Sequence, residues 1–96
     1  MGNVRIDGND IYDRNGNKIG YVNGSDIYGR NGNKIGYVQG HDIYDSNYSK
    51  IGYAQGDDIY DSNYSKIGTM DNVRESIEGG PGGTILVAIW FFFVRK

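Results

Sequence analysis

Aspartate and asparagine side chains recur in this sequence at a spacing that could hold a calcium ion. Asp13-Arg14-Asn15-Gly16-Asn17 places oxygen ligands at alternate positions, as the first half of an EF-hand loop does. The glycine stands at the wrong place for such a loop, however, and no bidentate glutamate follows. Later segments carry Gly29 in place of Asp13, and Ser49 or Ser65 in place of Asn17. We therefore interpret these residues as turn formers and expect no metal site.

Residue types for acid–base or nucleophilic catalysis are scarce. His41 is the single histidine, and the equivalent positions elsewhere hold Asn9, Ser25 and Asp57, so it occupies a variable turn position without a fixed proton-transfer partner. No G-x-G-x-x-G or P-loop spacing occurs, and no serine or threonine lies in a nucleophile motif. We expect no catalytic residues and no cofactor, and we predict that the protein is not an enzyme.

Regularly spaced tyrosines form the surface of greatest chemical interest. Aromatic rings flanked by aspartates could stack on sugars or other extended polymers, or they could pack against another protein layer, since tyrosine suits both roles. We favour packing and keep the glycan interface as the alternative. The candidates are Tyr12, Tyr28, Tyr44 and Tyr60, together with Tyr21, Tyr37 and Tyr53.

These residues belong to an internal repeat. Four segments of 16 residues share the pattern G-x-D-I-Y-D-x-N-x-x-K-I-G-Y-V-x, and residues 4–7 look like the closing half of a preceding unit. Near-identical copies build a regular surface and not a single catalytic constellation. We assign residues 1–70 to one β-repeat domain, with repeats at 8–23, 24–39, 40–55 and 56–71.

Each unit predicts a β-hairpin. Two β-favouring runs, such as residues 10–13 and 18–22, are separated by Asn15-Gly16, and Asn23-Gly24 leads into the next unit. Asn-Gly is typical of two-residue type I′ turns, in which both central residues have positive φ. Later units carry Tyr48 and Tyr64 where the turn glycine stood. Either those turns are strained or only the asparagine has positive φ.

Two-residue turns throughout predict an all-β antiparallel meander of tandem hairpins. In this register Tyr12 faces Ile19 and Asp13 faces Lys18, and one face collects the tyrosines while the other sets Ile11 opposite Gly20. The alternative is a short-coil β-solenoid, which would stack identical residues. A flat sheet of either kind exposes an apolar Tyr/Ile face, so we expect a second copy, a partner or the C-terminal segment to cover it.

The repeat stops after Gly68. Residues 71–78 predict a short helix with Asp71 as N-cap and Gly79 as its C-terminal stop. Residues 79–83 form a Gly/Pro hinge, and residues 84–96 are a hydrophobic tail. Eleven apolar residues make ~17 Å of helix, short of a ~30 Å hydrocarbon core.

The tail has two interpretations. Its aromatic residues and terminal Arg95-Lys96 favour a membrane anchor, whereas its β-branched and aromatic content also suits a strand or helix buried across the sheet. From the residues alone both stay open. The side chains concerned are Ile85, Leu86, Val87, Ile89, Trp90, Phe91, Phe92 and Phe93.

The run DIYDxNxxKIGYVxG at residues 10–24 and in its copies, followed by residues 78–83 and an aromatic tail at 90–94, resembles a group of small bacterial repeat proteins described as putative transmembrane or hypothetical proteins. The resemblance covers nearly the whole chain. It implies a bacterial, membrane-associated protein of unknown function, and it supplies no mechanism.

Bulk properties limit the partners. The chain has 96 residues, a net charge of −2 and interspersed charges, so it lacks the basic patch that nucleic-acid binding needs. We predict a structural or interaction repeat module that is anchored to a membrane by its tail and forms a homo-oligomer, with binding of a glycan or other extended polymer as the alternative function.

Overall fold

A computed structural model describes residues 3–80 and 82–95 of the chain, and most of them belong to one curved sheet. Neighbours in sequence are neighbours in the sheet, in the order β10-β1-β2-β3-β4-β5-β6-β7-β8-β9. Pairing is antiparallel from β1 to β9, which confirms the predicted meander and excludes the solenoid. The strands are β1 (Val4–Asp7), β2 (Asp10–Asp13), β3 (Lys18–Asn23), β4 (Asp26–Gly29), β5 (Lys34–Gln39), β6 (Asp42–Asp45), β7 (Lys50–Gln55), β8 (Asp58–Asp61), β9 (Lys66–Thr69) and β10 (Ile77–Gly79).

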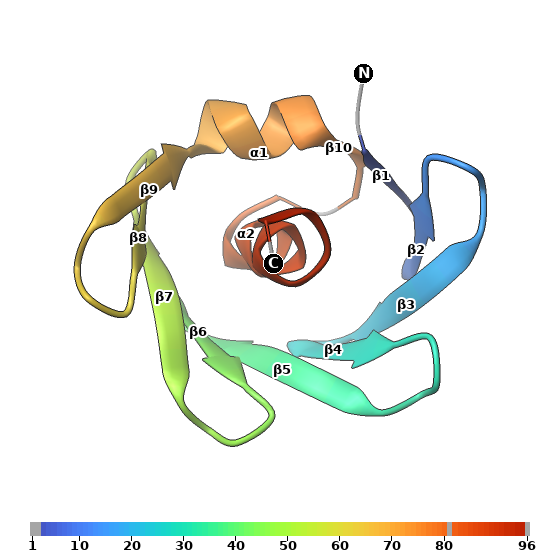
Figure 1. Cartoon of the computed structure of the whole chain (residues 1–96), viewed down its shortest axis with the longest axis horizontal. Coiled ribbons are helices and arrows are strands. Elements are labelled where there is room, and N and C mark those ends of the chain that lie inside the picture. The colour runs from blue at the N-terminus through green and yellow to red at the C-terminus, as the bar shows by residue number, and fades with distance from the viewer. Residues whose placement is uncertain (1–2, 81, 96) are drawn as a thin grey trace.

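The sheet curls into a ring around the C-terminal segment (Figure 1). Strand β10 pairs parallel with β1, so the chain that follows the repeats returns to the first strand. The sheet itself is not closed, because β9 and β10 lie at its two edges. Helix α1 (Met70–Ser76) bridges this gap and completes the wall of the ring (Figure 1). A C-terminal helix fills the centre.

Successive units are joined by two-residue turns, but not at the predicted residues. Asn23 pairs with Asp26, so the central residues are Gly24 and Ser25. Gly24 has φ +63, as the first central residue of a type II′ turn requires. Tyr21 therefore pairs with Tyr28, whereas a two-residue turn at Asn23-Gly24 would have set Ile19 opposite Tyr28. The shift is two residues, an even number, so each side chain keeps its predicted face.

The turn inside each unit is longer than predicted. Gly16 donates its N–H to the Asp13 carbonyl and Asp13 donates to the Asn17 carbonyl, which forms a three-residue loop with a bulge. Gly16 has φ +85 and Tyr48 and Tyr64 have φ 67 and 66, so only this last loop residue is left-handed. The bulge also moves Tyr12 opposite Lys18 instead of Ile19. The two later turns are thus strained, one of the two alternatives drawn from the sequence.

Asp13 stabilises its own turn, although the predicted register placed it opposite Lys18. Its carboxylate accepts the Asn15 N–H at 2.9 Å and the Asn17 N–H at 3.0 Å, and this last bond chiefly lowers the pKa of the carboxyl. Asp45 and Asp61 accept the equivalent bonds in their loops. The aspartates are therefore turn formers, as expected.

The second unit offers a direct test of this turn chemistry. Gly29 occupies the aspartate position, with the same backbone bonds to Asn33 and Gly32 and ordinary van der Waals room for a Cβ. We expect Gly29→Asp to raise the free energy of unfolding by about 1 kcal/mol, through restored hydrogen bonds and lower unfolded-state entropy. Urea denaturation measures it. The reverse change, Asp45→Gly, should cost a similar amount, and a neutral result for both would contradict the assignment.

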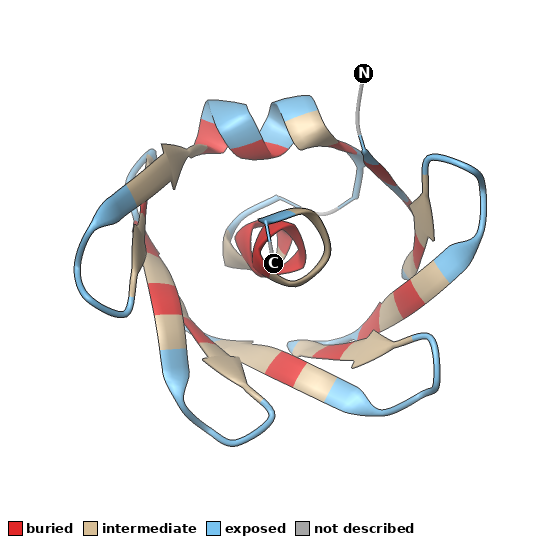
Figure 2. Cartoon of the chain, viewed as in Figure 1, coloured by how far each residue is buried: buried red, intermediate tan, exposed pale blue. Residues whose placement is uncertain are grey.

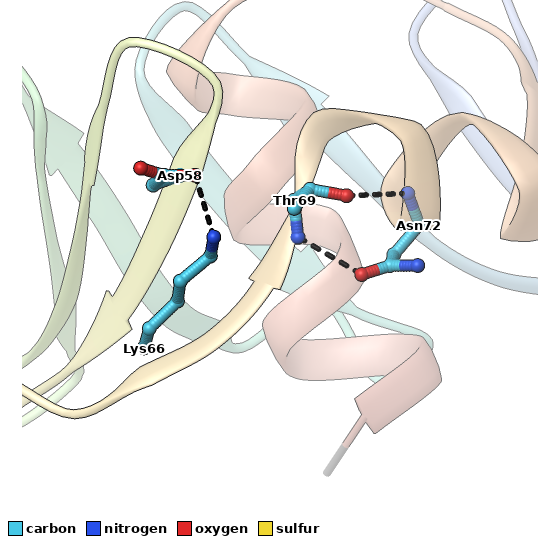
Figure 3. A network of polar contacts seen from close by, with 4 residues as sticks. All are labelled: Asp58, Lys66, Thr69 and Asn72. Carbon is cyan, nitrogen blue, oxygen red and sulfur yellow. Dashed lines mark hydrogen bonds and ion pairs between the residues drawn. The ribbon is translucent and has the colours of Figure 1, made fainter.

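The N-cap of helix α1 lies two residues earlier in the chain than predicted. Thr69, not Asp71, is the N-cap: its hydroxyl accepts the Asn72 N–H at 3.3 Å, and the Asn72 carboxamide accepts the Thr69 N–H at 2.9 Å (Figure 3). This reciprocal pair is a capping box. The helix ends at Ser76 and not at residue 78, because Ile77 is extended and starts β10. Pairing with β1 outweighs continuation of a short helix.

The hydrophobic tail lies inside the ring. Residues Thr84–Ile89 form α2 and Trp90–Arg95 form a π-helix, η1. Buried residues make up much of this central segment and recur as bands along the strands of the ring (Figure 2). Leu86, Val87, Ala88, Ile89, Trp90 and Phe91 are buried, and Ile85, Phe92, Phe93 and Val94 pack partly buried against the same core. Within residues 3–80 and 82–95, no helix has the length and apolar character needed to cross a membrane. Pro81 of the predicted hinge and Lys96 lie outside the described residues.

Each repeat receives one aromatic ring of the tail at a glycine. A Cβ on Gly20 would lie 2.8 Å from Phe93 Cζ, and one on Gly36 would lie 2.6 Å from Phe92 Cε2. A Cβ on Gly52 would lie 3.0 Å from Phe91 Cε1, and one on Gly68 would lie 3.0 Å from Trp90 Cη2. The glycines opposite Ile11, Ile27, Ile43 and Ile59 are therefore the space into which the tail packs.

This one-to-one match explains the unusual helix. Four consecutive tail residues meet four consecutive units of the ring, in reverse order along the chain. An α-helix turns by more than a quarter of a circle per residue, at about 3.6 residues per turn. A ring of four hairpins and a bridging helix needs a smaller step. The wider π-helix, with i→i+5 bonds, supplies it, so we attribute η1 to the symmetry of the surrounding ring.

Candidate functional site

Strand alternation directs the tyrosines to the outside of the ring. Ile11, Ile27, Ile43 and Ile59 are fully buried against the tail, and the tyrosines beside them point the other way and are half-buried. The C-terminal segment therefore covers the Ile/Gly face, which becomes the core. We had expected the Tyr/Ile face to be the one that is covered. The reason is volume, because only the face with glycines has room for four aromatic rings.

The tyrosines of neighbouring hairpins form stacked pairs. Tyr21 and Tyr28 lie 4.7 Å apart between ring centroids, with an interplanar angle of 7°. Equivalent pairs join Tyr37 to Tyr44 at 5.0 Å and Tyr53 to Tyr60 at 4.9 Å. The structure thus brings six of the seven predicted tyrosines together in pairs. Tyr12 stands apart from them, with the Arg5 guanidinium 4.7 Å from its ring centroid.

A lysine completes each stacked pair. The ammonium groups of Lys18, Lys34 and Lys50 lie 5.3, 4.8 and 4.7 Å from the ring centroids of Tyr21, Tyr37 and Tyr53. Each ammonium also contacts the first aspartate of its hairpin, as Lys34 does with Asp26 at 3.0 Å. That hydrogen bond is the main cause of the raised pKa of Lys34. Each of these three rings therefore has a stacked tyrosine and a lysine ammonium as close neighbours.

Two tyrosines that the sequence analysis left out of the site remain open to a ligand. Tyr48 and Tyr64 are 74% and 73% exposed, the large hydrophobic side chains most accessible among the described residues. Each lies beside a stacked pair, with its ring 5.9 Å from that of Tyr37 or Tyr53 at 59°. The sequence contained one sign of their importance, which is a bulky residue at the left-handed turn position where the first two units have glycine.

The resulting surface has two equivalent aromatic clusters. We define the first cluster as Lys34, Tyr37, Tyr44 and Tyr48, and the second as Lys50, Tyr53, Tyr60 and Tyr64. In each, one open ring stands at an angle to a stacked pair, so a ligand would meet two aromatic walls and polar turn residues. Aromatic rings beside hydroxyl and amide groups are side chains of the kind that suit non-covalent recognition. In the part of the chain that the structure describes, no group of histidine and carboxylate side chains is suited to hold a metal.

The tail residues of the predicted site do not form a surface. All eight named side chains belong to the core or pack against it, and Arg95 lies 5.7 Å from the Phe91 ring centroid. Their role in the structure is to fill the ring.

Comparison with known proteins agrees with this architecture. No match was found among curated proteins or among solved structures. The sequence pattern of the 5-fold beta-flower proteins matches residues 1–94. The four hairpins and the bridging helix around one central segment are consistent with five sectors (Figure 1). The chain belongs to the 5-fold beta-flower family.

Proposed function

We propose that this protein is a non-enzymatic binding module that holds an extended glycan on the two aromatic clusters of its outer wall. The observation that carries the proposal is the exposure of Tyr48 and Tyr64 at left-handed positions. A non-glycine residue in this conformation costs about 1–2 kcal/mol. The tilted contact with one neighbouring ring returns only about 0.5–1.5 kcal/mol. The side chain therefore adds little to folding, which leaves a role in recognition.

Sugars suit these clusters chemically. The C–H faces of a pyranose carry partial positive charge and pack on the negative face of an aromatic ring. Ser46, Asn47 and Ser49 are exposed in the same loop as Tyr48, and Ser62, Asn63 and Ser65 accompany Tyr64, which provides donors and acceptors for sugar hydroxyls. Because the two clusters lie on neighbouring hairpins, one polymer can engage both, and the second contact then gains from a high effective concentration.

The test replaces both open rings by the residue of the first two units, in the variant Tyr48→Gly/Tyr64→Gly. We expect retention on insoluble polysaccharides (cellulose, chitin) to fall at least tenfold. Loss of strain and loss of the ring contact offset each other, so stability should stay within about 1 kcal/mol of the parent protein. Tyr12→Ser, which alters an outer tyrosine beyond both clusters, should leave retention unchanged. A parent protein that is not retained, or a double variant that still binds, would contradict glycan binding.

Membrane association and self-association remain predictions from the sequence. An anchoring role needs the tail outside the ring, where it would expose the inner face of the repeats. Flotation of the full chain with lipid vesicles and light scattering of the free protein measure the two properties separately. Strong self-association lost in the double tyrosine variant would instead identify the clusters as an interface between copies.

A further inference from the structure

One pocket lies where two of the turns between units meet the first turn of α2. Its volume is about 310 Å³, near the lower end of the roughly 300–1,000 Å³ range of small-molecule sites. Ala54, Met70 and Val87 supply apolar walls, and Asp57 and Arg74 are exposed at its rim together with His41. The pocket is separate from the aromatic clusters, and none of their residues contributes to it.

The repeat defines what this place looks like elsewhere on the ring. In each of the four units, a residue in or directly after the second strand donates its backbone N–H to the carbonyl of the second residue of the turn that opens the unit. The four bonds are Val22 to Asn9, Val38 to Ser25, Ala54 to His41 and Met70 to Asp57. The backbone is therefore equivalent at four positions, and only the side chains distinguish them.

We call each of these four bonded positions a junction. The pocket lies at the third and fourth junctions, whose side chains differ from those of the first two. Ala54 stands where Val22 and Val38 stand, and its smaller side chain lines the pocket together with Val87. Asp57 replaces the neutral asparagine or serine of the first turns. Arg74 comes from α1, the one helical sector of the wall. Among the four equivalent junctions, this one combines the pocket with the Asp57 carboxylate and the Arg74 guanidinium.

We propose that this pocket binds a free α-amino acid with an apolar side chain. Neither a simple acid nor a simple amine matches the rim, because Asp57 would repel the first and Arg74 the second. An α-amino acid satisfies both: its carboxylate faces the Arg74 guanidinium, its ammonium faces the Asp57 carboxylate, and its side chain enters the space beside Ala54. The nearest charged partner of Arg74 is the exposed Asp71, at 3.7 Å, a contact too weak to occupy the guanidinium.

L-Leucine is the probe, with 4-methylpentanoate and 3-methylbutylamine as analogues that lack the ammonium or the carboxylate. Titration into the ¹⁵N-labelled full chain, followed by NMR, should show saturable shifts for leucine at the amides of Ala54 and Thr84. Each analogue should bind at least tenfold more weakly. Equal binding of leucine and an analogue, or no saturable shift with leucine, would overturn the proposal.

Single substitutions test the location of the site. Ala54→Val restores the side chain of the first two units and should weaken leucine binding at least tenfold, as should Arg74→Gln, which removes an exposed charge. Val38→Ala creates a similar hollow at a junction that has neither Asp57 nor Arg74, and it should add no second leucine site. The parent-like spectrum of each variant reports its folding. Undiminished binding in Arg74→Gln would refute the assignment even if Ala54→Val proved unstable.

Discussion

Phe91→Ala is expected to lower the free energy of unfolding by about 3–5 kcal/mol, a large share of the roughly 5–15 kcal/mol that is typical of a protein domain. Phe91 is 7% exposed and lies at the centre of the ring, where its side chain fills the space above Gly52. No other residue can move into the gap, because the neighbouring tail positions are matched to their own glycines. Urea denaturation followed by circular dichroism measures the loss.

The control for this change keeps the volume but not the ring. Phe91→Leu should cost clearly less, about 1–1.5 kcal/mol, because a large apolar side chain still fills most of the site. Tyr64→Ala, an aromatic truncation at an exposed position, should stay within about 1 kcal/mol of the parent. A Phe91→Ala protein that unfolds at the parent urea concentration would show that the ring stands without its central segment.

Gly52→Ala is expected to destabilise the protein by about 1–3 kcal/mol, the cost of overpacking a tight core. The added methyl would meet the Phe91 ring and lie 2.6 Å from the Tyr60 carbonyl oxygen, so both the tail and the β7–β8 pair would have to shift. In a double-mutant cycle, Phe91→Leu should relieve part of the cost, and the backbone contact should retain the rest.

Gly82→Ala provides the matched control, because a Cβ there meets nothing within 4 Å and the backbone is not left-handed. It should change stability by no more than about 0.5 kcal/mol. Equal effects of the two alanines would mean that glycine at position 52 matters through backbone entropy and not through the aromatic contact.

Local features of the sequence were sufficient to predict the strands and their antiparallel order. Repeated glycine and asparagine punctuate short β-branched and aromatic runs, and alternation separates Tyr12 from Ile11 onto opposite faces. Turn types were less predictable. Asn15-Gly16 is compatible both with a type I′ turn and with a three-residue loop, and the Asp13 carboxylate, which accepts two backbone N–H groups, favours the longer loop.

The local sequence pattern also predicted part of the candidate site. The tyrosine row was visible as a periodic pattern, and its pairing between hairpins follows from the even register shift. The importance of Tyr48 and Tyr64 depended on their conformation, which spacing alone does not reveal. The pocket beside Ala54 joins two turns, α1 and α2, and such distant segments meet only in the folded chain.

What the sequence by itself determined is the calcium-like Asp/Asn run as a turn, the repeat, and the division of each hairpin into a tyrosine face and an isoleucine–glycine face. What the tertiary structure decided is which face closes inward. Turns and strands depend on contacts within a few residues, whereas the position of the tail depends on burying four aromatic rings against glycines up to 73 positions away, as from Gly20 to Phe93. That long-range packing moved the hydrophobic tail into the centre of the ring and is coupled to its π-helical form.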